Sequence, residues 1–89
     1  MSPKLILSCS TSALAELRSF IQLNLEVFGF SELDKHQITL AVEEVVANLI
    51  IHSHACNPNE IIHLEIKDLG KKVAVEITDK GEGFNLLEY

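Results

Sequence analysis

The chain has 89 residues, a length that suits one domain and leaves no room for a second. Hydrophobic residues make up 47 % of it and charged residues 22 %, which is too apolar for a disordered segment and predicts a small packed core. The formal net charge is -6, with 7 basic residues scattered among 13 acidic ones, which argues against nucleic-acid binding because that needs clustered Lys and Arg.

Features of secreted and membrane proteins are missing from the sequence. The apolar stretches are shorter than the roughly 20 residues that cross a bilayer, and the N-terminus lacks a basic segment followed by an apolar signal region. The two cysteines, Cys9 and Cys56, fit no metal-ligand or redox spacing. We therefore expect a cytoplasmic protein with reduced thiols and no membrane partner.

The first third of the chain predicts a strand followed by a helix. Lys4 to Ser8 suits a short strand, and the Ser/Thr run that follows offers side-chain oxygens to cap a helix beginning near Ala13. Gly29 can adopt the left-handed conformation that ends such a helix. Apolar residues recur at steps of three and four, which predicts one buried stripe: Leu14, Leu17, Ile21, Leu25 and Phe28.

A second and longer helix should follow. Ser31 or Asp34 can cap its start, and it should continue to about His54 before Asn57, Pro58 and Asn59 stop it. Its apolar positions include Ile38, Val42, Val45 and Leu49.

Strict alternation predicts a hairpin in the last third. From Glu60 to Leu69 apolar and polar residues alternate, and Val73, Val75 and Ile77 repeat the pattern after Gly70. The element order of strand, helix, helix, strand and strand predicts an α+β fold. In it, helices pack in one layer on one face of a mixed or antiparallel sheet.

Two places carry polar residues that packing does not require. On the second helix, Gln37, Glu44 and Asn48 form a narrow polar row between apolar flanks, with His52 one turn further. A carboxylate and an amide one turn apart can line a pocket. On spacing alone, a solvated strip of a surface helix explains the row equally well.

The second place is the segment Asp79-Lys80-Gly81-Glu82-Gly83. Asp79 continues the two-residue phase of the buried positions before it, so its carboxylate should point toward the helices. Gly81 and Gly83 permit close approach by a ligand. A plain turn opened by Asp is the alternative.

Together the two segments resemble a known family. LAVEEVVANLIIH, from Leu40 to His52, resembles the N box of the histidine-kinase-like ATPases, and ITDKGEGF, from Ile77 to Phe84, resembles their first glycine box. The similarity is strongest to the small bacterial serine kinases that act as anti-sigma factors. It extends over nearly the whole chain and implies one partial domain, residues 1–89, with the Bergerat ATP-binding fold.

The resemblance also implies roles for individual residues and two cofactors, ATP and Mg²⁺. Glu44 would be the general base of a protein serine/threonine kinase, and Asn48 would hold magnesium on the phosphates. Asp79 would accept a hydrogen bond from the adenine amino group, with Gly81 and Gly83 shaping the adenine pocket. His52 matches the end of the N box, where packing or helix capping explains a histidine better than catalysis.

The chain departs from the family at its end. The family continues with a lid, a second glycine box and further strands, whereas this sequence stops at Tyr89. We therefore expect an incomplete phosphate cradle and an unpaired sheet edge along Val73 to Thr78.

The expected partners follow from the same resemblance. They are a sigma factor or an anti-anti-sigma protein, in transcription regulation by partner switching, together with a homodimer contact near Leu5, Ile6 and Leu7. A non-catalytic interaction module that keeps the fold, and a truncated form of an active protein, are the alternatives.

Overall fold

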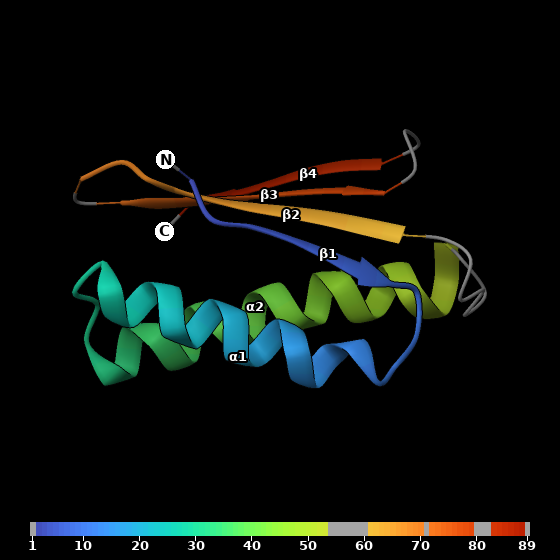
Figure 1. Ribbon diagram of the computed structural model, residues 1–89, viewed down its shortest axis with the longest axis horizontal. Helices are drawn as coiled ribbons and strands as arrows, with labels where there is room; N and C mark the ends of the chain where they lie inside the picture. The colour runs from blue at the N-terminus through green and yellow to red at the C-terminus, as the bar shows by residue number, and fades with distance from the viewer. Residues whose placement is uncertain (1, 54–60, 71, 80–82, 89) are drawn as a thin grey trace.

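The computed structural model describes residues 2–53, 61–70, 72–79 and 83–88, and of their side chains all except those of 52, 53, 79 and 83–88. Two helices lie in one layer beneath a four-stranded sheet (Figure 1). The elements in chain order are β1 (Lys4–Ser8), α1 (Ala13–Val27), α2 (Glu32–Asn48), the π-helix η1 (Leu49–Ser53), β2 (Ile61–Asp68), β3 (Val73–Asp79) and β4 (Gly83–Glu88). The predicted α+β two-layer fold is confirmed.

The sheet is antiparallel throughout, with strand order β1-β2-β3-β4. Ile6 pairs with His63 across β1 and β2, and Leu64 pairs with Ile77 across β2 and β3. At the hairpin between β2 and β3, Gly70 has a φ of +91°, and its amide donates to Asp68 Oδ1 at 3.0 Å. This turn needs a residue in the left-handed backbone conformation, which glycine adopts without steric cost.

Helix α1 forms where the apolar stripe predicts it. Leu17, Ile21 and Leu25 are fully buried, and Gly29 just beyond the helix end has a φ of +89°. The predicted side-chain cap is wrong. The Ser12 hydroxyl makes no capping hydrogen bond and lies 2.8 Å from the Ser10 hydroxyl instead.

Helix α2 begins as predicted, because the Ser31 hydroxyl accepts a hydrogen bond of 3.1 Å from the Asp34 amide. Its regular part ends earlier than expected. The α-helical winding stops at Asn48, and the next five residues continue as the wider π-helix η1. The Asn-Pro-Asn stop signal at 57–59 lies outside the described residues.

The core lies between the two layers, and its strand members alternate as predicted. Every second residue of β2 and β3 points toward the helices and is buried: Ile62, Leu64, Ile66, Val73, Val75 and Ile77. Cys9 is also buried, with its Sγ 4.0 Å from the Ile50 carbonyl oxygen, while Cys56 lies outside the described residues. Among the described helices, none has the length and apolarity to cross a bilayer.

A fourth strand was not predicted. Residues Gly83–Glu88 form β4, which pairs with β3 along its whole length, from Asp79 opposite Gly83 to Ala74 opposite Glu88. The expected unpaired edge at Val73 to Thr78 is therefore wrong. The sequence after the glycines contains Phe84, Leu86 and Leu87, which suit a strand, and the free edge of β3 gives them backbone partners.

Candidate functional site

The polar row predicted on the second helix lies on the exposed flank of α2. Glu44 and Asn48 are both exposed, and they project from neighbouring turns because residues four apart share a helix face. Leu40 and Ile51 beside them are 53 % and 54 % exposed. This flank therefore combines a carboxylate, an amide and uncovered apolar side chains, as a ligand-binding surface does.

The structure distinguishes the two neighbouring carboxylates of α2. Glu43 faces α1, where Arg18 Nε lies 2.8 Å from its Oε1 and Arg18 Nη2 lies 3.1 Å from its Oε2. This bidentate hydrogen bond holds the pKa of Glu43 below its usual range and raises the pKa of Arg18. Glu44 makes no ion pair with the described residues, so its carboxylate is available to a ligand.

The other predicted site residues lie at the end of β3. Asp79 is its last residue, and in backbone register it stands opposite Ile62 on β2 and Gly83 on β4. Strand β3 and helix α2 end at the same side of the molecule (Figure 1). The Asp79 side chain and Gly81 are outside the described residues.

The π-helix η1 starts directly after Asn48, and nothing in the sequence signalled it. A wide turn of this kind re-aims the neighbouring side chains and is frequent at functional sites. Ile50 anchors η1 in the core with 1 % of its surface exposed. His52 lies in this turn, and its side chain is not among those described.

The donor set fits a magnesium ion that arrives on a nucleotide. Among the described residues, no group of three or more His, Cys, Asp or Glu could hold a metal by itself. Mg²⁺ is usually held by one or two side chains together with substrate phosphates, and the oxygen of Asn48, with Glu44 one turn away, suits that arrangement.

Two grooves on the described surface lie elsewhere. The larger runs between α1 and α2 and the smaller crosses the outer face of β1, β2 and β3; neither is lined by Glu44 or Asn48. In the described part of the chain, the candidate site is therefore an open flank of α2 and not a pocket.

Comparison with known families gives one result. A family model described as "Histidine kinase-like ATPase domain" matches residues 7–88. The matched range includes every predicted site residue, from Glu44 and Asn48 on α2 to Asp79, Gly81 and Gly83. The comparison with curated proteins gives no match.

Proposed function

Because this chain belongs to the histidine kinase-like ATPase domain family, we propose that it is an ATP-binding regulatory protein with its nucleotide site between α2 and the end of β3. One observation carries the proposal. Of the two neighbouring carboxylates, Glu43 is bound to Arg18, while Glu44 is exposed one turn from Asn48. Family membership implies ATP as the ligand, and the α2 flank offers the polar groups that ATP with magnesium needs.

Each residue of the proposed site has a separate role. Asn48 would hold magnesium on the phosphates, where the ion would supply charge neutralisation for phosphoryl transfer. Glu44 accepts the proton of the attacking hydroxyl or water at its carboxylate. Asp79 accepts a hydrogen bond from the adenine amino group, and Gly81 and Gly83 leave room for the ring.

More specifically, we propose that the chain has the function of the anti-sigma serine kinases. The chain would act in the cytoplasm on a sigma factor or an anti-anti-sigma protein, and ATP binding would set which partner it holds. The motif pair from Leu40 to His52 and from Ile77 to Phe84 supports this proposal.

Titration calorimetry with Mg-ATP tests the nucleotide site. We expect binding to the unaltered chain, and a loss of about tenfold or more in Asn48→Ala, because a bond to a charged ligand is worth roughly 1.5–3 kcal/mol. Gln22→Ala is the control, since Gln22 is an exposed amide on α1, outside the polar row of α2. ATP with EDTA should bind poorly, because a chain of net charge -6 repels the bare triphosphate.

The second candidate is an interaction module that keeps the fold without phosphoryl transfer. The pairing of β4 with β3 favours it, because the chain after Gly83 continues the sheet where the family would continue with the lid. Absence of heat with ATP, ADP and adenosine at millimolar concentration would reject the nucleotide site and leave this candidate.

A further inference from the structure

Arg18 is the single arginine of the chain, and it lies beside the residues of the proposed nucleotide site. Its guanidinium donates two hydrogen bonds to the Glu43 carboxylate, of 2.8 Å from Nε and 3.1 Å from Nη2. Glu44 follows Glu43 directly, so their Cα atoms are about 3.8 Å apart. The contact with Glu43 therefore holds a cation within one residue of the proposed catalytic base.

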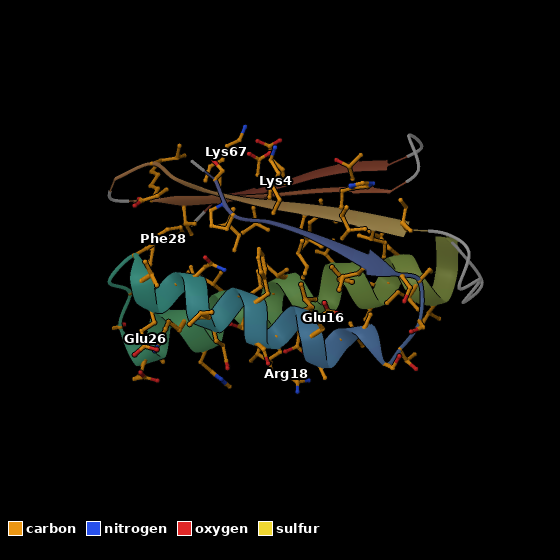
Figure 2. All side chains as sticks on the ribbon, in the orientation of Figure 1. Lys4, Glu16, Arg18, Glu26, Phe28 and Lys67 are labelled. Carbon is orange, nitrogen blue, oxygen red and sulfur yellow. The ribbon has the colours of Figure 1, made fainter. Side chains whose placement is uncertain are left out.

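The packing of the two helices does not depend on this ion pair alone. Leu17 and Ile21 on α1 and Val42 and Val46 on α2 are fully buried in the core. The Arg18 side chain, in contrast, is 52 % exposed, and Figure 2 shows it projecting from the side of the helix layer that faces away from the sheet. An exposed ion pair contributes modestly to stability, so a stronger anion can displace Glu43 from the guanidinium.

An anionic ligand finds little positive charge on this layer. The two helices hold six carboxylates and two basic residues. The other basic residue, Lys35, lies 2.6 Å from Glu32, and it precedes Glu44 by nine residues, which is roughly 13.5 Å along the helix axis. Arg18 is therefore the basic side chain of the described helices that lies nearest to the proposed base.

The order of the predicted site residues along α2 indicates which phosphate Arg18 would meet. In the proposed site the adenine lies at the end of β3, and α2 ends at the same side of the molecule (Figure 1). Asn48 is the last residue of α2, and Glu44 lies one turn before it, roughly 6 Å along the axis. A phosphate chain that starts from the adenine end passes Asn48 first, and its terminal phosphate comes closest to Glu44 and Arg18.

We propose that Arg18 is a phosphate-binding residue that leaves Glu43 for the terminal phosphate of ATP, and that it thereby distinguishes ATP from ADP. A guanidinium donates paired hydrogen bonds to a carboxylate and to a phosphate in the same planar geometry. A terminal phosphate carries more negative charge than a carboxylate, which favours the exchange. The inference rests on the proposed nucleotide site and goes beyond it, because neither of the two motif segments includes Arg18.

Two substitutions should shift the affinity for Mg-ATP in opposite directions. Arg18→Met removes the guanidinium and should weaken binding about tenfold or more, because hydrogen bonds to a charged group are lost. Glu43→Gln removes the competing carboxylate and should tighten binding up to about fivefold, since that is the worth of an exposed ion pair. The affinity for Mg-ADP, which lacks the terminal phosphate, should stay nearly unchanged in both variants. Titration calorimetry measures each affinity.

Two further variants exclude indirect effects. The double variant Arg18→Met/Glu43→Gln should still bind Mg-ATP more weakly than the unaltered chain, because the guanidinium is missing. Lys4→Met is the control for the loss of one positive charge, since Lys4 is exposed on the outer face of the sheet, on the other side of the molecule from Arg18 (Figure 2). It should bind Mg-ATP as the unaltered chain does. Circular dichroism checks that each variant is folded.

The NMR spectrum of the arginine Nε–H group observes the exchange of partners directly, because a chain with one arginine gives one such signal. This signal should shift when the chain is saturated with Mg-ATP. With Mg-ADP it should stay near its ligand-free position, because Arg18 then remains on Glu43.

Three results would overturn the proposal. The first is equal weakening of Mg-ATP binding by Arg18→Met and Glu43→Gln, which would show that the pair only holds the helices together. The second is full recovery of ATP affinity in the double variant, which would show that Arg18 only neutralises Glu43. The third is binding of Mg-ATP with an unshifted Arg18 signal, which would leave the nucleotide site standing without Arg18. Absence of ATP binding would reject the nucleotide site and this inference together.

Discussion

Glu43 and Glu44 are adjacent carboxylates whose side chains leave α2 about 100° apart, so one meets α1 and the other does not. The family resemblance assigned the catalytic role to Glu44 from motif position alone. In the structure Arg18 binds both oxygens of Glu43, while the catalytic role of Glu44 stays a prediction. That contact joins residues 25 positions apart, and no local pattern in the sequence could have predicted it.

The contact predicts a pH-dependent contribution to stability. The pKa of Glu43 is lowered in the folded chain, so its contribution is present above the ordinary carboxyl pKa of about 4.3 and is lost as pH falls through the lowered value. Glu43→Gln should therefore lower the urea midpoint at pH 7 and leave it nearly unchanged at pH 2. Glu44→Gln is the control and should give the same midpoint as the unaltered chain at pH 7. An equal fall of the urea midpoint in both variants would contradict the assignment of the ion pair to Arg18 and Glu43.

Substitutions at two proposed site residues should separate the effect on ATP binding from the effect on phosphoryl transfer. Asp79→Asn should weaken ATP binding, because it removes the charged acceptor that we propose for the adenine amino group. Glu44→Gln should leave binding nearly unchanged and abolish phosphate release, because a general base acts on the reaction rather than on the bound ground state. Calorimetry and a phosphate assay measure the two effects. Equal loss of binding in both variants would mean that the roles are misassigned.

The elements differ in how well the sequence predicted them. Helix α1 and strands β2 and β3 follow directly from apolar periodicity, because each buries one face: Leu17 and Ile21 on the helix, Leu64 and Ile77 on the strands. Strand β4 was missed, since its formation depends on pairing with β3, which is a tertiary effect. The π-helix was missed because nothing in a run of apolar residues distinguishes i→i+5 hydrogen bonds from the i→i+4 bonds of an α-helix.

The buried stripe of α1 gives a matched stability prediction. Leu17 is 0 % exposed and Leu23 is 64 % exposed on the same helix. Leu17→Ala should cost about 2–5 kcal/mol, because it removes buried methyl groups and leaves a cavity in the core. Leu23→Ala should change stability by about 0.5 kcal/mol or less. Urea unfolding measures both, and similar effects would show that the helix does not pack as described.

At the scale of the whole molecule, β4 changes the reason for expecting a dimer. The edge of β3 is paired, so the free backbone groups of the described sheet lie on the outer sides of β1 and β4. Strand β1 is the better candidate for a contact between copies. Ile6 on it is 61 % exposed, and the run from Leu5 to Leu7 is apolar, with Lys4 the single charged residue of the strand. An apolar edge strand invites pairing with another chain.

We therefore expect a homodimer in which β1 lies at or near the contact, as the run from Leu5 to Leu7 suggested. Light scattering at micromolar concentration should give about twice the monomer mass of 9.9 kDa. Ile6→Lys should shift the mass toward the monomer, since a charge on an edge strand opposes pairing. Leu69→Lys is the matched control, because Leu69 is 52 % exposed beside the turn between β2 and β3. A monomer mass that stays constant on concentration would disprove the dimer. A dimer whose mass is unchanged by Ile6→Lys would contradict the assignment of the contact to β1.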